Sequence, residues 1–150
     1  MANFVFNIAK GRAVELYNRV DINDPAAATI VVVPLETSGL EAQSALEDSL
    51  TLAEVLDGAT NEQTTMGRKT LTDADIAAFT NDTTNNRNDL DLPDQVWTAA
   101  TGNAISALVI CYSPSAGADS TIIPLSHHDF VVTPDGSDIT AQIAVFFRAS

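Results

Sequence analysis

The residues best suited to chemistry in this sequence are His127-His128-Asp129, with Ser126 beside them. Hydroxyl, imidazole and carboxylate groups can form a hydrolytic triad, and imidazole also binds metal ions. Adjacent residues of a strand point to opposite faces, so the two imidazoles are not expected to share a metal ion. No G-x-S-x-G elbow surrounds Ser126. We expect a polar patch at the start of a strand, with a pH-sensitive subunit contact as the alternative role.

A second concentration of polar ligand atoms lies in residues 80–95. Carboxylate and amide oxygens are the ligands that Ca²⁺ prefers, but the EF-hand order of acids, central glycine and final glutamate is absent. We therefore expect a solvated loop held by Asx turns, with a calcium site as the alternative. The oxygen ligands in this segment would be Asp82, Asn85, Asn88, Asp89 and Asp91.

The remaining sequence offers little reactive chemistry. Its single cysteine, Cys111, lies in the apolar run 108–112, where we expect a buried and inert thiol. Neither the phosphate-binding pattern G-x-x-x-x-G-K-[ST] nor G-x-G-x-x-G occurs. We therefore predict no enzyme activity, no cofactor, no metal and no small-molecule substrate.

The charge of the chain is strongly acidic and uneven. The formal net charge of −13 disfavours nucleic-acid binding, because such a surface repels phosphate backbones. Residues 1–19 contain Lys10, Arg12 and Arg19 against Glu15, a net charge of +2, so the rest of the chain has −15. A basic N-terminal segment on an otherwise acidic chain would help subunits to associate in a defined orientation. Chance clustering in a lysine-poor chain is the alternative.

Strands are the main elements that must position these groups. Residues 29–35 form an apolar, valine-rich run typical of a strand buried on both faces, and residues 105–112 predict a long central strand. Residues 13–20 fit a strand or a helix, and we favour the strand. The other predicted strands are 4–8, 95–99, 121–125, 129–133 and 139–147, which brings the total to about eight.

Two short helices are expected to lie on the sheet as lids. Thr51 and Glu54 form a capping box, with Leu50 and Val55 as its hydrophobic staple. A similar start signal occurs at residues 71–76, where a threonine cap is followed by acidic residues.

Together these elements predict one domain over residues 1–150, which is long enough for its own core. The expected fold class is mainly β (β-dominated α+β), a single antiparallel β-sandwich or barrel-like domain with two short helices. No apolar run approaches the ~20 residues needed to span a bilayer. The opening residues lack the features of a signal peptide, so we expect a chain that is made and kept in a cytoplasm until release.

Several segments of the chain resemble a widespread family of tailed-bacteriophage structural proteins. The opening residues 2–12 resemble the start of these proteins. Three segments in the closing part of the chain also resemble the family, namely Ile123-Pro124-Leu125-Ser126-His127-His128-Asp129-Phe130, Asp135-Gly136-Ser137-Asp138 and Phe146-Phe147-Arg148-Ala149-Ser150. Residues 82–87 and 91–93 extend the resemblance over nearly the whole chain. The pattern supplies no catalytic residues.

The resemblance implies a non-enzymatic virion protein. The first role it suggests is a capsid decoration (cement) protein that binds the major capsid protein lattice. The second is a small structural protein of the tail, collar or fibre attachment. The implied partners are the major capsid protein or other virion proteins, and further copies of the chain, a trimer being one such assembly. Neither nucleic acid nor membrane is expected as a partner. The implied location is the virion, after synthesis in the host cytoplasm.

Apolar side chains near both ends are the candidate protein interface, since aromatic residues there are good interface anchors. The alternative is that both ends are simply paired strands of one sheet. A carbohydrate-binding module, with Trp97, Tyr112 and the polar loop lining a shallow site, is a further hypothesis. The candidate interface residues are Phe4, Val5, Phe6, Ile8, Val145, Phe146, Phe147 and Arg148.

Overall fold

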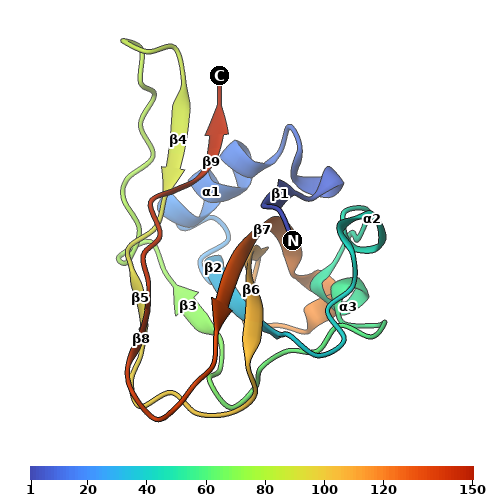
Figure 1. Ribbon diagram of the computed structural model, residues 1–150. Coiled ribbons are helices and arrows are strands. Elements are labelled where there is room, and N and C mark those ends of the chain that lie inside the picture. Colours follow the sequence, from blue (N-terminus) through green and yellow to red (C-terminus); the bar gives the residue numbers. More distant parts are fainter.

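An antiparallel five-stranded sheet forms the centre of the structure, a computed structural model that describes residues 1–150 (Figure 1). Its strand order is β1-β7-β6-β2-β3. The fold is mainly β, as the sequence predicts, and the strands do not close into a barrel. The strands of this sheet are β1 (Phe4–Val5), β2 (Thr29–Glu36), β3 (Lys69–Leu71), β6 (Ile105–Ser113) and β7 (Ile123–Val132).

Strands β2 and β6 form the buried middle of the sheet. Val33 pairs with Val109 and Val32 with Ile110, and cross-strand partners share a face, so each face carries its own row of apolar side chains. All four of these side chains are buried. The apolar runs at 29–35 and 105–112 therefore mark strands buried on both faces, which confirms the prediction.

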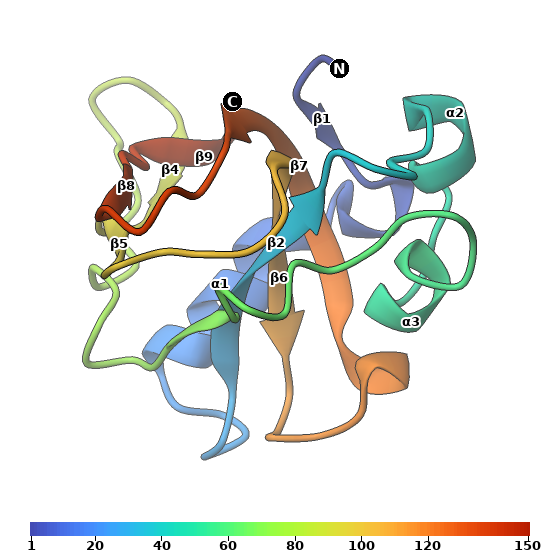
Figure 2. The same ribbon diagram turned by 60° about the horizontal axis from the view of Figure 1, so that its bottom comes forward.

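Short helices cover parts of the sheet (Figure 2). The segments α2 and α3 lie together at one side of the sheet. Helix α1 packs against β2 and β4 (Asn88–Asp91). No helix combines the length and the apolar composition that a membrane span requires. The helices are η1 (Asn7–Ala9), α1 (Ala13–Asp21), α2 (Gln43–Leu46), α3 (Leu52–Val55) and η2 (Asp119–Thr121).

Two short antiparallel ribbons form the second β layer. They are built from the same two chain segments, so they follow one another as an interrupted ribbon (Figure 1). At the interruption, the main-chain N–H of Ile143 donates to Asp94 Oδ1 at 3.0 Å. The ribbons are β4 (Asn88–Asp91) with β9 (Val145–Ala149), and β5 (Gln95–Trp97) with β8 (Ile139–Ala141).

The favoured strand at residues 13–20 is wrong, because this segment is the helix α1. Ala13, Leu16, Tyr17 and Val20 are buried, and their spacing places them on one face of a helix. A strand would have put Val14 on the same face as Leu16, yet Val14 remains partly exposed. The burial pattern therefore decides between the two periodicities.

The second predicted helix, after Thr72, is also absent. The main-chain N–H and hydroxyl of Thr72 both donate to Asp75 Oδ2, at 2.8 and 2.9 Å, and close a turn. A single turn does not repay the cost of helix nucleation without further packing. The helix after Thr51 is confirmed as α3, and Thr51 Oγ1 accepts from the Glu54 N–H. Leu50 is 53% exposed, so the predicted staple is wrong.

Strand boundaries differ from the expectation at several places, and β3 was not predicted at all. The two strands predicted at 121–125 and 129–133 are parts of one strand, β7 (Ile123–Val132), whereas the strand predicted at 139–147 is interrupted between β8 and β9. The first strand ends at Val5 and continues as η1. The segment 80–95 was expected to be a loop but contains β4 and the start of β5. Nine strands are therefore present where about eight were predicted.

The loop before β6 gives a testable packing constraint. Gly102 has φ +112°, and a Cβ there would collide with the buried Gln63 amide, whose Nε2 donates to the Asn103 carbonyl at 2.8 Å. We expect Gly102→Ala to lower the free energy of unfolding by about 3 kcal/mol. Gly136→Ala is the matched control, since Gly136 also has positive φ but open space around it, and should cost about 1 kcal/mol. Urea denaturation would measure both, and equal losses would contradict the collision.

Candidate protein interface

His127 and His128 point to opposite faces of the central sheet, as the sequence predicts. His127 pairs across the sheet with Val109, and His128 with Leu108. The His128 Nε2 lies 2.8 Å from Ser126 Oγ. The two imidazoles therefore do not converge, and Ser126 contacts the histidine two residues away in place of its neighbour.

His127 is fully buried beneath the N-terminal strand. Its ring stacks on Phe4, with centroids 4.7 Å apart and an interplanar angle of 10°. Neither ring nitrogen has a hydrogen-bond partner. Burial lowers the pKa of His127 to about 4, against an opposing effect of the Asp129 carboxylate. The short strand β1 thus covers a neutral imidazole that has no polar contacts of its own.

The carboxylates of Asp82 and Asp89 in the segment 80–95 contact side chains of the same chain. Asp82 accepts from Asn85 and lies near Arg87, while Asp89 pairs with Arg148 at 2.6 Å. No group of three or more acidic, histidine or cysteine side chains is arranged to hold a metal ion. The carboxylates instead stiffen the β4–β9 ribbon through arginine contacts.

The predicted interface residues fall into a buried and an exposed group. Phe6 and Phe146 belong to the core, and Phe146 lies 6.3 Å from the Tyr17 ring. Phe4, Val5, Ile8 and Phe147 are half-buried against the core, whereas Val145 and Arg148 are exposed. Both ends are paired strands, but β1 belongs to the central sheet and β9 to a ribbon.

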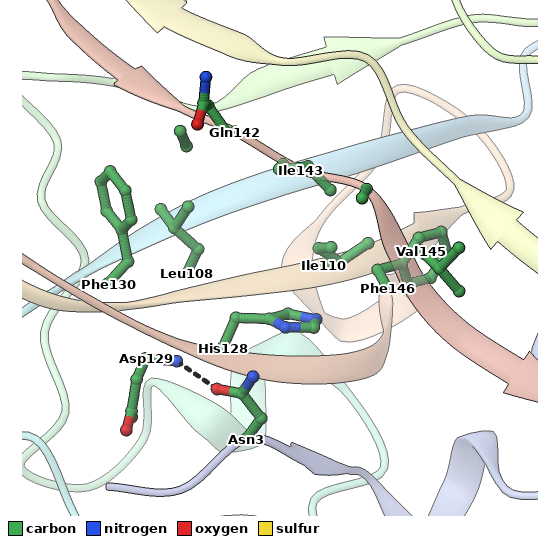
Figure 3. A pocket seen from close by; sticks show the side chains of 12 residues that line it. Asn3, Leu108, Ile110, His128, Asp129, Phe130, Gln142, Ile143, Val145 and Phe146 are labelled. Carbon is green, nitrogen blue, oxygen red and sulfur yellow. Dashed lines mark hydrogen bonds between the residues drawn. The ribbon is translucent and has the colours of Figure 1, made fainter.

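Both chain ends nevertheless reach the same hollow, which we call the β7 groove (Figure 3). It has a volume of about 230 Å³ and lies between β7 and the segment that joins β8 to β9. Asn3 borders it on one side and Val145 on the other. The groove is lined mainly by apolar side chains, among them Leu108, Ile110, Phe130, Ile143 and Phe146, together with His128.

An acidic hollow of about 420 Å³ adjoins the β7 groove. The two share Ile143 and Ala144 as a common wall. The acidic hollow contains Asp75, Asp91 and Asp94, and the β7 groove contributes Asp129. Neither lysine nor arginine lines either hollow, and the N-terminal ammonium lies 3.3 Å from the Asp129 carboxylate. The negative charge is therefore concentrated in the acidic hollow.

Sequence reasoning found only part of this surface. Among the residues that line the groove, it singled out His128, Asp129, Val145 and Phe146, but missed Phe130 and Ile143. Val131 is 81% exposed, and its position in a run of apolar residues at 130–132 is the one signal that could have pointed to it. The groove itself needs the β8–β9 segment to fold back over β7, which no local pattern encodes.

The buried aromatics argue against a shallow glycan site. Trp97 and Tyr112 are 2% and 3% exposed. Trp97 Nε1 donates to the Gly67 carbonyl at 2.9 Å, and Lys69 covers its ring. Cys111 is also buried, as predicted, and burial raises the pKa of its thiol.

No protein-family model, curated protein or solved structure matches the chain.

The buried imidazole gives a pH-dependent stability. The pKa of His127 is about 4 in the folded state and close to 6.5 when unfolded, so the unfolded state binds the proton first as the pH falls. We expect this residue to remove about 3 kcal/mol of unfolding free energy between pH 6.5 and pH 4. His127→Leu should flatten that part of the profile, measured by urea denaturation at a series of pH values.

The matched control is His128→Gln, which leaves the His127 ring in place. Burial also lowers the pKa of His128, so this variant should flatten the slope too, but less than His127→Leu does. Hydrogen bonds lower the pKa values of Asp75, Asp82 and Asp89, so protonation of these carboxylates reduces the unfolding free energy at a lower pH than protonation of His127 does. An unchanged slope in His127→Leu would show that His127 is not the group that titrates.

Proposed function

We propose that the protein is a non-enzymatic structural component of a tailed-bacteriophage particle, and that it acts as a capsid decoration (cement) protein on the major capsid protein lattice. The main support is the β7 groove, where both chain ends border an apolar hollow beside a partly unpaired strand. Such a surface suits protein contacts. The sequence resemblance to phage structural proteins supports the same role.

The β framework suits a repeated structural contact. The N-terminal strand pairs with β7 and the C-terminal strand with β4, so neither end of the chain is left to fray. A surface whose parts are held by sheet pairing meets a partner with little loss of conformational entropy. This property favours a subunit that must occupy many equivalent positions on a particle.

The charge distribution also favours a protein partner. Arg19, Arg68, Arg87 and Arg148 form ion pairs with the chain's own carboxylates. In the N-terminal part of the chain, the side chains of Lys10 and Arg12 form no ion pair with a carboxylate. The chain as a whole has a net charge of −13. An acidic body of this kind would bind basic or apolar protein surfaces and avoid the packaged nucleic acid.

The proposal predicts many copies of the chain in each virion. Quantitative mass spectrometry of purified particles should give a ratio to the major capsid protein near one, or another large fraction set by the lattice. A few copies per particle would instead favour the tail, collar or fibre-attachment role. Loss of the protein from particles washed in high salt and purified by density would contradict a virion role altogether.

A further inference from the structure

The outer side of β7 has a strand position that the chain fills only in part. β7 runs from Ile123 to Val132 and is paired with β6 over nearly its whole length. On the other side, β1 pairs only with Ser126 and His127. No strand lies beside the stretch from Asp129 to Val132, although the N-terminal residues approach its start.

A side chain takes the place of a strand at the start of this open edge. The main-chain N–H of Asp129 donates to Asn3 Oδ1 at 2.8 Å (Figure 3). The N-terminal ammonium lies 3.3 Å from Asp129 Oδ2. Beyond this point Val131 is 81% exposed, and neither a lysine nor a proline protects the edge. The register of β7 against β6 shifts by one residue between Asp129 and Val132. The exposed apolar Val131 in this stretch nevertheless suits pairing with another strand.

The surroundings of the edge define the chemistry of an occupant. Phe130 lies half-buried in the β7 groove on one face of the strand, and the exposed Val131 follows it in the chain. The groove is apolar, and the Asp129 carboxylate at its rim already contacts the N-terminal ammonium, but the adjoining acidic hollow provides Asp75, Asp91 and Asp94. An extended segment would therefore need apolar side chains for the groove and basic side chains for the carboxylates.

We propose that the open edge of β7, from Asp129 to Val132, binds an extended segment of a partner protein in which apolar residues alternate with lysine or arginine. The segment continues the position of β1, adds main-chain hydrogen bonds to β7, and places apolar side chains in the β7 groove. This inference deepens the proposed function and rests on it for the identity of the partner, a virion protein.

Charge makes a second copy of this chain a poor occupant. Two copies each carry a net charge of −13, and four of the seven basic residues are already paired within the chain. The N-terminal basic residues Lys10 and Arg12 follow η1, so they do not alternate with apolar residues in a free strand. A basic segment of another protein meets the acidic rim without this repulsion.

Peptide binding tests the chemistry of the edge without a particle. The probes are short acetylated peptides that alternate valine with lysine, valine with glutamate, and serine with lysine. NMR should show that the valine–lysine peptide shifts the amides of Asp129–Val132 and Ile143, and that the other two bind at least about tenfold more weakly. Equal binding of the valine–glutamate peptide, or shifts spread over the acidic surface without the β7 edge, would overturn the proposal.

A matched pair of variants locates the contact. Val131→Lys should weaken the valine–lysine peptide about tenfold, because it adds a like charge and removes an apolar side chain from the edge. Ile22→Lys changes another exposed apolar residue, 57% exposed, outside the groove, and should leave binding unchanged. Circular dichroism checks that both variants fold. Equal effects of the two variants would contradict binding at β7.

Hydrogen exchange on particles separates this inference from the proposed function. Amides 129–132 should exchange at least about tenfold more slowly in particle-bound protein than in free protein. Bound protein with unprotected amides would overturn the strand addition and leave the virion role intact. Peptide binding at β7 by a protein that is absent from purified particles would refute the virion role alone. Concentration-dependent dimers that Val131→Lys disperses would instead assign the edge to self-pairing and overturn the proposal.

Discussion

The structure depends on the burial of β6 on both of its faces. A strand with apolar side chains on both faces needs cover on each side, and it lies between β2 and β7 in the sheet. The short helices α2 and α3 lie at one side, while the ribbons and α1 supply cover from another direction (Figures 1 and 2). The β7 groove is a result of this arrangement, because the β8–β9 segment covers β6 and β7 incompletely.

The central strands could be predicted from sequence because their patterns have one interpretation. Residues 29–35 are almost all apolar and β-branched, so neither an amphipathic helix nor a half-exposed strand fits them. The segment 13–20 fits two periodicities, and only the tertiary contacts of Tyr17 and Leu16 select the helix. Similarly, the Thr72 cap signal is genuine, but it closes a turn where no further packing rewards a helix.

The candidate interface was harder to predict than the fold, for a physical reason. An aromatic residue near a chain end can be buried in the core of its own chain or against a partner protein, and the sequence does not distinguish the two. Phe6 and Phe146 are buried in the core. The exposed surface instead depends on which part of β7 is left without a neighbour. That depends on the register of β1, whose first residue Phe4 pairs with His127, and no residue pattern marks this register.

The pairing of β1 with β7 also affects the order of folding. Phe4 and His127 are neighbours in the sheet, yet nearly the whole chain separates them in sequence. Contacts of this separation form late, because the entropy of closing the intervening loop must be overcome first. On the ribosome, the first strand has to wait unpaired until β7 emerges, and the β6–β7 pair can form before it. The last cover placed over His127 is thus the segment of the chain that was synthesised first.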